Sequence, residues 1–278
     1  MPDTDREHTI GRSVEYTGVS LHTGKSARLR LVPAPESTGI VFVRVDLPGS
    51  PEVRATAANI IEGDRATTIG TGSGEVSVRT VEHLIAAIRG MSIDNIRCEL
   101  DAEEVPMGDG SAATFVEMIN EAGIVPQGSP RQEVVIDRPV WVSDGPRHLI
   151  ALPYHGLKVT YVFDSDVPFV GVQHVEFEIS RDSFVCEIAP ARTVGFEEEI
   201  EALQARGLGL GGRADTVVVV GRHGYLGTLR FPDEIARHKV LDIIGDLGLA
   251  GPVRAHIVGI ASGHSMNHRL ARLIMGEC

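Results

Sequence analysis

Three side chains that can bind a metal ion recur at regular intervals in the segment 232–247. His238, Asp242 and Asp246 are each separated by four positions, and at about 3.6 residues per turn they share one face of a helix. Neutral imidazole and carboxylate are ordinary zinc ligands, so His238 and Asp242 can bind one ion together. The alternative is a solvated polar stripe on a surface helix, for which this spacing is also typical.

A catalytic zinc ion needs a third protein ligand and an open position for water. The segment TVEHLIAAIRG places a histidine and a carboxylate in the expected first turn of a helix. His83 is the candidate third ligand, and Glu82 beside it can take a proton from water without occupying the metal. A capping or surface role is the alternative for this pair, because acidic residues are favoured in a first helical turn.

Two further segments contain candidate catalytic groups. His264 follows the apolar run HIVGIA in SGHSMNH, and active-site residues often cluster where a strand ends. Thr193 in PARTVGF carries a hydroxyl that can donate a hydrogen bond to a developing oxyanion, although its spacing alone indicates only a turn. We expect His268 to be a surface helix residue and His22, in GVSLHTGK, to be structural.

The first half of the chain must position Glu82 and His83. Residues 9–44 alternate apolar and polar side chains between Gly, Pro and Ser, which predicts antiparallel strands. A helix is expected in TVEHLIAAIRG, with Thr80 as its N-cap and Gly90 as a left-handed C-cap. The strand NIRCEL and a second helix, AATFVEMINEAG, follow. This half therefore reads as a sheet carrying two helices.

The second half repeats that order. Strands are expected in VVIDRPVWV, HLIALPYH, LKVTYVFD and VEFEI, a helix near EEEIEALQARG, and another helix opening at Pro232. Residues 124–132, IVPQGSPRQ, have the composition of a linker. The sequence thus predicts an α+β fold with two related domains, residues 1–126 and 127–278.

Composition narrows the functional class. The 278 residues are 42% hydrophobic, and 38 acidic against 26 basic side chains give a net charge of −12. That charge disfavours a nucleic-acid binder or an anionic-membrane surface protein, but not an anionic small-molecule ligand.

Three widely spaced cysteines favour a reducing compartment. With no signal-like N-terminus and no apolar stretch of about 18 residues, we expect a cytoplasmic protein without an integral membrane segment. No obligatory protein partner is indicated.

Taken in order, several motifs resemble the UDP-3-O-acyl-N-acetylglucosamine deacetylase family along nearly the whole chain. They are GVSLHTGK, VPAPESTGIVFVRVDLPG, TVEHLIAAIRGMSIDNIRCELDAEEVPMGDGSAATFVE, IAPARTVGF, GLGLGGRAD, LRFPDEIARHKVLDIIGDL and SGH. The resemblance implies two related α+β domains, each a sheet with two helices, packed as a β-α-α-β sandwich. The metal site would then lie at the domain junction.

The resemblance also implies roles for individual residues. One zinc ion per chain would be bound by His83, His238 and Asp242, with Glu82 as general base; ferrous iron is tolerated by similar ligands. Lys239 would lie beside the metal, where it can favour the oxyanion or a substrate phosphate.

Asp246 would orient and charge the imidazole of His264. Either Glu82 or His264 could then protonate the leaving amine, and the sequence does not decide between them. Thr193 would help to stabilise the oxyanion.

The implied substrate is a UDP-sugar with a 3-O-linked hydroxyacyl chain, and deacetylation to the free 2-amine and acetate is the committed step of lipid A biosynthesis. An acyl-chain passage is expected within residues 190–212, with Phe196 as a lining residue. The chain departs from the family at Ala261, where a basic residue is common, which predicts weaker diphosphate binding. The alternatives are action on a different acylated sugar, or non-catalytic binding of zinc or a nucleotide sugar.

Overall fold

Alternating apolar and polar residues in the first hundred positions form a five-stranded sheet. The structure is a computed structural model that describes residues 6–63 and 65–276. In β3, Ala27, Leu29 and Leu31 are buried while their neighbours are exposed, because successive side chains of a strand point to opposite faces. The strand order is β2-β3-β9-β4-β5, and β4 pairs with β9 in parallel while the other pairs are antiparallel. The strands are β2 (Val14–Val19), β3 (Ser26–Pro33), β4 (Ile40–Arg44), β5 (Glu52–Arg54) and β9 (Ile96–Leu100).

A second sheet repeats this topology in the second half of the chain. Its order is β12-β13-β19-β14-β15, and again the last strand in sequence lies in the centre and pairs in parallel with the third. A short strand, β11 (Val134–Val135), also pairs with β19. The other strands are β12 (Val140–Asp144), β13 (Arg147–Leu152), β14 (Leu157–Phe163), β15 (Gln173–Glu178) and β19 (Val253–Ile260). The shared strand order confirms the predicted relation between the two halves.

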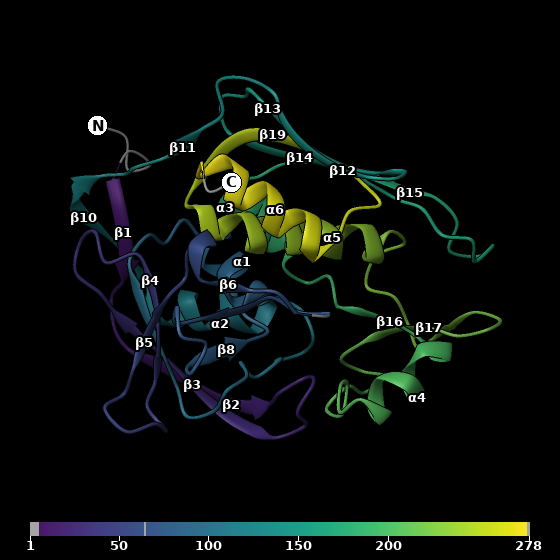
Figure 1. The fold of residues 1–278 in the computed structure, drawn as a ribbon, viewed down its shortest axis with the longest axis horizontal. Helices are drawn as coiled ribbons and strands as arrows, with labels where there is room; N and C mark the ends of the chain where they lie inside the picture. The colour runs from purple at the N-terminus through teal and green to yellow at the C-terminus, as the bar shows by residue number, and fades with distance from the viewer. Residues whose placement is uncertain (1–5, 64, 277–278) are drawn as a thin grey trace.

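Four helices lie between the two sheets (Figure 1). In each half one helix precedes the central strand and another follows it, so α1 corresponds to α5 and α2 to α6. Their bounds are α1 (Glu82–Gly90), α2 (Ala113–Ala122), α5 (Glu234–Leu247) and α6 (His264–Ile274). The α+β class is therefore confirmed.

Each half also carries an additional small sheet at the same point in its order, between the fourth strand of its main sheet and the first of its two helices that lie between the sheets. In the first half this sheet comprises β6 (Ile60–Ile61), β7 (Thr68–Gly70) and β8 (Ser77–Arg79), preceded by a 3-10 turn over Ala57–Asn59. In the second half it comprises β16 (Val194–Phe196), β17 (Val218–Val220) and β18 (Tyr225–Leu226), together with α4 (Glu197–Ala205). The short α3 (Arg181–Ser183) and a π-helical turn over Phe184–Ile188 precede it.

The expected linker has more structure than its composition indicated. Strand β10 (Ile124–Pro130) pairs antiparallel with β1 (Arg6–Ile10) and closes the first half with its own N-terminal segment. Residues 124–130 are therefore a paired strand, because a partner strand far away in sequence satisfies their backbone. The division between residues 126 and 127 stays a prediction.

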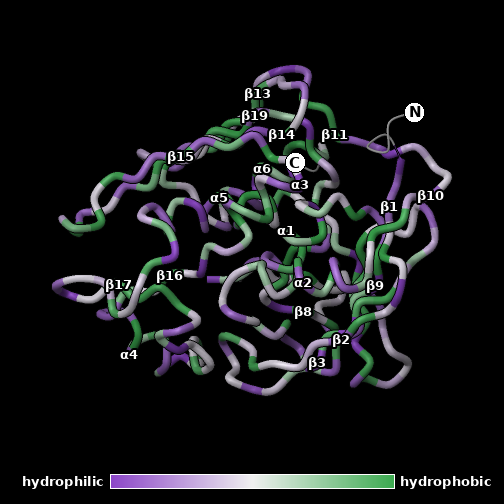
Figure 2. Tube along the Cα trace, turned by 180° about the vertical axis from the view of Figure 1, so that it is seen from behind, coloured by the Kyte–Doolittle hydropathy of each residue, from purple (hydrophilic) through white to green (hydrophobic). Residues whose placement is uncertain are grey.

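One hydrophobic core extends through both halves. It includes Leu84 and Ile85 of α1 together with Leu241 and Ile244 of α5, and Figure 2 shows hydrophobic segments converging between the sheets. No helix within residues 6–63 and 65–276 has the length and apolar character required to cross a membrane.

Two details of α1 differ from expectation. The Thr80 hydroxyl donates a hydrogen bond to Glu104 Oε1 at 3.0 Å instead of capping the helix, whose N-cap position is Val81. Gly90 lies within the helix, and a Cβ there would come 2.3 Å from the ring of Phe184. Gly90 therefore permits close packing, while the positive φ falls at Ser92 (φ 59°).

Candidate active site

The packing of α1 against α5 brings together the three residues expected to bind metal. His238 Nε2 lies 3.3 Å from Asp242 Oδ1, and His83 Nε2 lies 3.9 Å from the same oxygen. The rings of the two histidines meet edge to face, with centroids 4.9 Å apart. All three side chains are buried, and one ligand atom from each lies within 4.8 Å of the others.

The protonation state of the two histidines suits a bound cation. His238 Nδ1 lies 3.0 Å from the carbonyl oxygen of Ala191; a carbonyl can only accept, so Nδ1 carries the proton and Nε2 keeps its lone pair. Burial, and then the neighbouring His238, lower the pKa of His83 to about 3. Burial also lowers the pKa of His238. Both imidazoles are therefore neutral near pH 7, as metal ligands must be.

Asp242 supplies the negative charge of the cluster. Burial alone would raise its pKa, but Lys239 and the surrounding histidines hold it below its usual value. Its Oδ2 accepts a hydrogen bond from Lys239 Nζ at 2.8 Å. Its Oδ1 is buried and has no hydrogen-bond partner among the described residues, which is costly unless something else satisfies it. The three residues thus fit a divalent cation.

Glu82 lies beside this cluster, at the start of the same helix as His83. The side chain is buried, and its Oε2 accepts a hydrogen bond from the backbone N–H of Thr67 at 3.0 Å. Burial raises the pKa of Glu82 to about 8, against the opposing effect of His264. A carboxyl group with a pKa near neutrality can both take up and release a proton.

His264 lies at the first position of α6, just beyond the end of β19. Its Nδ1 donates a hydrogen bond to Asp246 Oδ2 at 2.8 Å, and its Nε2 lies 3.9 Å from Asp242 Oδ2. Burial opposes the charged form, but Asp246 and Asp242 raise the pKa of His264 to about 10. The predicted pairing of His264 with Asp246 is therefore present, and the imidazole is charged.

Thr67 and His268 belong to the same hydrogen-bonded network as Asp246 and His264. Neither was predicted from the sequence as a site residue. The Thr67 hydroxyl donates to Asp246 Oδ1 at 2.5 Å and accepts from His268 Nε2 at 2.8 Å. Asn267 also donates to Asp246 Oδ2, at 2.8 Å. His268 is buried, so its expected surface role was wrong. Its spacing of four from His264 was an available signal, whereas nothing in the sequence singles out Thr67.

A second group of possible ligands, formed by Asp246, His264 and His268, also has atoms within 4.8 Å of one another. It differs from the first group because its carboxylate is already satisfied. Asp246 Oδ1 accepts from Thr67, and Oδ2 accepts from His264 and Asn267. Since Asp242 Oδ1 is unsatisfied and Asp246 is not, the first group is the better candidate for a metal ion.

Thr193 lies immediately before β16, in an irregular segment whose Ala191 carbonyl contacts His238. Its backbone N–H donates to the Gly110 carbonyl at 2.9 Å, and its own carbonyl accepts from Val218 N–H at 2.8 Å. It lies two positions beyond Ala191, whose carbonyl accepts from His238. The backbone of Thr193 is therefore anchored on both sides, and its role at the site stays a prediction.

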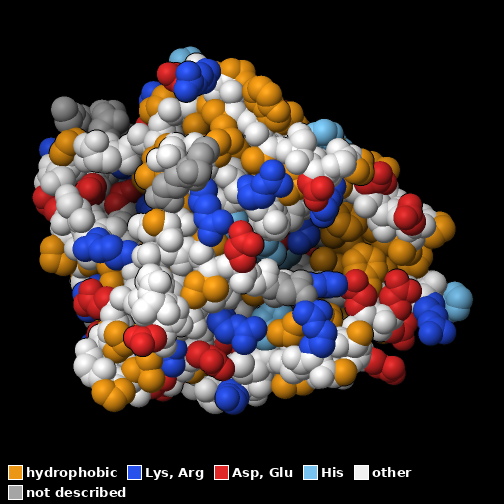
Figure 3. Space-filling view, in the orientation of Figure 1, with side chains coloured by type: hydrophobic (Ala, Val, Ile, Leu, Met, Phe, Trp, Pro, Cys, Tyr) orange, Lys and Arg blue, Asp and Glu red, His pale blue; other side chains and the backbone are white. Residues whose placement is uncertain are grey.

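Phe196 lies on β16 and belongs to an apolar cluster instead of the polar one. It packs against a small hydrophobic cluster of its own whose buried members are Val170, Val218, Val220 and Ile235. Figure 3 shows hydrophobic side chains in a hollow on this side of the molecule. The small sheet to which Phe196 belongs continues to β18 (Tyr225–Leu226), beyond residues 190–212. The acyl-chain passage stays a prediction.

His22 lies next to a buried carboxylate that organises the neighbouring loop. Glu104 accepts hydrogen bonds from the backbone N–H groups of His22 and Thr23, both at 2.8 Å, as well as from the hydroxyl of Thr80. His22 Nδ1 in turn accepts from Gly209 N–H at 3.3 Å. These contacts join the loop before β3 to the segment after α4.

Taken together, the fold and the site define an α+β protein with a buried cluster that can hold a metal ion. Residues 7–276 match the sequence profile of UDP-3-O-acyl N-acetylglycosamine deacetylase, and the chain belongs to that family. It is 44% identical over 275 residues to the UDP-3-O-acyl-N-acetylglucosamine deacetylase of Chlamydia felis, covering 98% of this chain and 97% of that protein. The deacetylase of the same name from Bdellovibrio bacteriovorus is 40% identical over 271 residues, covering 96% and 89%. Members of this family are hydrolases that act on an amide.

Proposed function

We propose that this protein hydrolyses the N-acetyl group of UDP-3-O-(3-hydroxyacyl)-N-acetylglucosamine, giving the free 2-amine and acetate, as the committed step of lipid A biosynthesis. The observation that carries the proposal is the meeting of His83, His238 and Asp242 beside the buried carboxyl of Glu82, in a chain whose relatives bear that deacetylase's name. A cytoplasmic location stays a prediction.

One zinc ion is the cofactor that we assign to His83, His238 and Asp242. Two neutral imidazoles and one carboxylate are a typical donor set for catalytic zinc, although similar ligands accept ferrous iron. When bound, such an ion supplies Lewis-acid chemistry, acidifying a water molecule and polarising a carbonyl oxygen. The unsatisfied Oδ1 of Asp242 supports this assignment.

Glu82 is the general base in this proposal. Its carboxylate takes a proton from the attacking water while the hydrogen bond from Thr67 N–H holds its position. Burial raises its pKa to about 8, which helps it to keep that proton until the carbon–nitrogen bond breaks. Glu82 can then return the proton to the departing amine.

In this proposal His264 is a charged imidazole that lies beside the tetrahedral intermediate of amide hydrolysis. Asp246 holds its Nδ1–H at 2.8 Å, so Nε2 presents the other proton toward the Asp242 side of the site. That proton can stabilise the oxyanion or pass to the amine nitrogen. Both roles need the charge that Asp246 maintains.

Lys239 and Thr193 are proposed to contact the substrate at the reacting carbonyl. The Lys239 ammonium pairs with Asp242 Oδ2 at 2.8 Å and is partly exposed, so it can also attract a substrate phosphate. The anchored backbone of Thr193 supports its hydroxyl as a hydrogen-bond donor to the oxyanion. Phe196 and the apolar cluster around it are the proposed contact for the acyl chain.

A different acylated sugar as substrate is the second candidate, motivated by Ala261. This residue has a positive φ of 47°, and its N–H donates to Val162 O, but it offers no side-chain charge to a diphosphate. Non-catalytic binding is disfavoured, because a binder has no need for a buried base and a charged imidazole together.

The test is release of free amine from UDP-3-O-(3-hydroxyacyl)-N-acetylglucosamine by the zinc-loaded protein, beside a chelator-treated sample and the Glu82→Gln variant. We expect zinc-dependent turnover that falls by roughly 10²- to 10⁴-fold in the variant, while its zinc content is unchanged. Turnover that survives in Glu82→Gln would refute the assigned base. No turnover on this substrate, with turnover on a sugar of another nucleotide or acyl chain, would favour the second candidate.

A further inference from the structure

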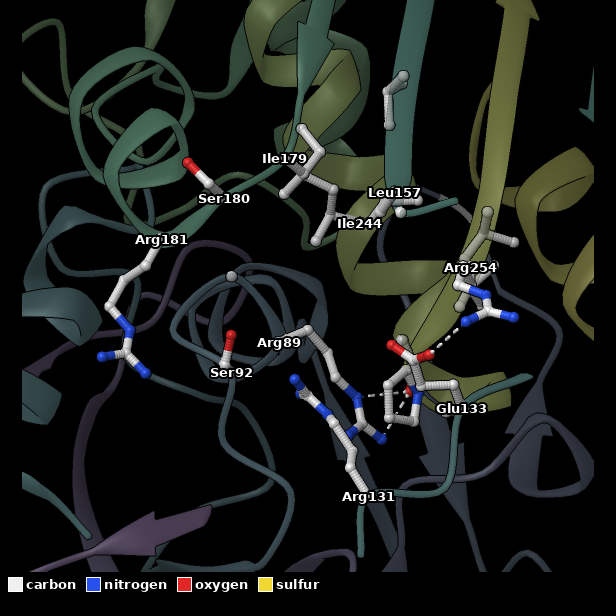
Figure 4. A pocket seen from close by; sticks show the side chains of 18 of the residues that line it. Arg89, Ser92, Arg131, Glu133, Leu157, Ile179, Ser180, Arg181, Ile244 and Arg254 are labelled. Carbon is white, nitrogen blue, oxygen red and sulfur yellow. Dashed lines mark hydrogen bonds and ion pairs between the residues drawn. The ribbon is translucent and has the colours of Figure 1, made fainter. Parts of the chain in front are cut away.

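A cavity of about 940 Å³ opens between the two halves, away from the catalytic cluster. Its walls include Arg89 and Ser92 at the C-terminal end of α1 and Ile244 and Gly248 at the C-terminal end of α5 (Figure 4). Arg89 lies seven residues beyond Glu82 on α1, a rise of about 10 Å along the helix. The cavity therefore uses the same two helices as the catalytic cluster. On α1 it lies at the opposite end from Glu82 and His83, whereas on α5 its residues Ile243 and Ile244 lie between Asp242 and Asp246 in sequence but at other positions around the helix.

The cavity is cationic although the protein is acidic. Four arginines line it, Arg89, Arg131, Arg181 and Arg254, against two acidic residues, Glu133 and Asp182. The lining carries four positive and two negative charges, and Asp94, outside the lining, pairs with Arg131, which leaves an excess of one positive charge in a chain whose net charge is −12. Such a local reversal of sign attracts anions.

Arg89 is the lining arginine whose contacts bear most directly on anion binding. Its Nε and Nη2 donate to the carbonyl oxygen of Gly248, at 3.2 and 3.1 Å, and within the described part of the chain no carboxylate lies within 4.0 Å of it. Arg131, shown beside it in Figure 4, is instead paired with Asp94 at 2.9 Å. Burial lowers the pKa of Arg89 to about 10, so the group is still charged near pH 7. Asp94 acts on Arg89 only from beyond ion-pair distance, so this half-buried guanidinium can still gain a close counter-charge from a bound anion.

The lining also has an aliphatic wall, beside the polar side chains of His8, Ser92, His155 and Ser180. Leu157 and Val159 from β14, Ile179 after β15, Ile244 from α5 and Val253 from β19 contribute apolar surface. No Phe, Tyr or Trp is among the lining residues, and the aromatic rings of the lining are those of His8 and His155. An aliphatic chain matches this wall, and the volume is in the range of small-molecule sites.

We propose that this cavity is a binding site for an amphipathic anion, with a carboxylate or phosphate head near Arg89 and Arg181 and an aliphatic chain against Leu157, Val159 and Ile244. The head group is defined here by its charge and its hydrogen-bond acceptors, which guanidinium groups bind well. The site is separate from the proposed catalytic reaction and does not depend on it.

Calorimetric titration of the full zinc-loaded chain with four probes tests the chemistry. The probes are decanoate, decyl phosphate, decanol and inorganic phosphate. We expect each charged amphiphile to bind at least about tenfold more tightly than decanol or inorganic phosphate, and the tighter of the two to identify the head group. Equal binding of decanol and decanoate, or no binding of any amphiphile, would overturn the proposal.

Variants locate the binding. Arg181→Glu reverses an exposed cavity charge, Leu157→Asn interrupts the apolar wall, and Arg138→Glu is the charge-matched control outside the lining. We expect the first two to weaken the preferred amphiphile by about tenfold or more and the control to leave it unchanged. Binding that is unaffected by Arg181→Glu and Leu157→Asn but lost in Phe196→Ala would place the chain in the proposed acyl passage and overturn the separate site. Deacetylation by Arg181→Glu should equal that of the parent chain, which shows that the variant is folded.

Discussion

Gly245 of α5 lies directly against the carbonyl oxygen of Glu82 on α1: a Cβ at position 245 would come within 2.2 Å of that oxygen. The contact is between two backbones, so neither side can yield by a change of rotamer. It permits the close approach that places His83 of α1 beside His238 and Asp242 of α5. The catalytic cluster therefore depends on the absence of a side chain at this position.

Gly245→Ala should consequently separate the two helices and damage the site. We expect a loss of about 1–3 kcal/mol in the free energy of unfolding, as is typical of overpacking, together with weaker zinc binding. Urea denaturation and metal analysis measure the two effects. Gly72→Ala is the control, because a Cβ at Gly72 meets nothing within 4 Å. Equal stability of the two variants would show that α1 and α5 are not held this closely.

Metal content distinguishes the two candidate metal-binding groups, which are His83, His238 and Asp242 in the first and Asp246, His264 and His268 in the second. We expect Asp242→Asn to lose most of the bound zinc, because it removes the unsatisfied carboxylate oxygen of the first group. Asp246→Asn should keep about one zinc per chain and lose activity, because it alters the partner of His264. Elemental analysis after dialysis measures zinc directly. The opposite pattern of zinc retention would assign the metal to Asp246, His264 and His268.

Thr67→Val tests the hydroxyl that connects Asp246 with His268. Valine keeps the shape of the side chain but removes hydrogen bonds at 2.5 and 2.8 Å. We expect kcat to fall about tenfold, corresponding to the loss of roughly 1–1.5 kcal/mol of hydrogen bonding, with zinc content unchanged. Thr71→Val, at an exposed hydroxyl, is the matched control. An unchanged kcat in Thr67→Val would show that Thr67 contributes to catalysis only through its backbone N–H, which donates to Glu82.

The ion pair between Arg192 and Glu234 should make stability depend on pH. Burial alone would raise the pKa of Glu234, but hydrogen bonds from Arg192 and from the Arg230 N–H hold it below its usual value. A carboxylate with a lowered pKa stabilises the fold above its unfolded pKa, about 4.3, and that contribution disappears as the pH falls through the folded pKa. At pH 7 we expect Glu234→Gln to be less stable by about 3–5 kcal/mol.

Urea titrations of the parent chain and Glu234→Gln between pH 3 and pH 7 measure this dependence. The difference between them should shrink as the pH falls below about 4.3. Arg213→Ala is the control, because its pair with Asp215 is exposed and should contribute little. A difference that is constant over the whole pH range would show that Glu234 acts through packing and not through its charge.

Local periodicity predicted most of the elements that carry the site. The alternation in β3 and β14 and the helical spacing in α1, α2 and α5 appear in the structure close to the expected residues. Two local features depend on partners that are distant in sequence. Residues 124–130 form β10 because β1 pairs with them, and Gly90 packs under Phe184 instead of ending its helix in a left-handed turn. Propensity alone does not register such contacts.

The sequence by itself determined which side chains could act together within one element. The helical period places His238 and Asp242 on one face of α5 wherever that helix packs, and the ordered motifs indicated the family. Only the tertiary structure decided that His83 meets them, that Asp242 Oδ1 is left unsatisfied, and that Asp246 is saturated by Thr67, His264 and Asn267. Thr67 and Asp246 are 179 positions apart. Spacing describes residues along one helix, whereas the distance between two helices depends on how closely their backbones can pack.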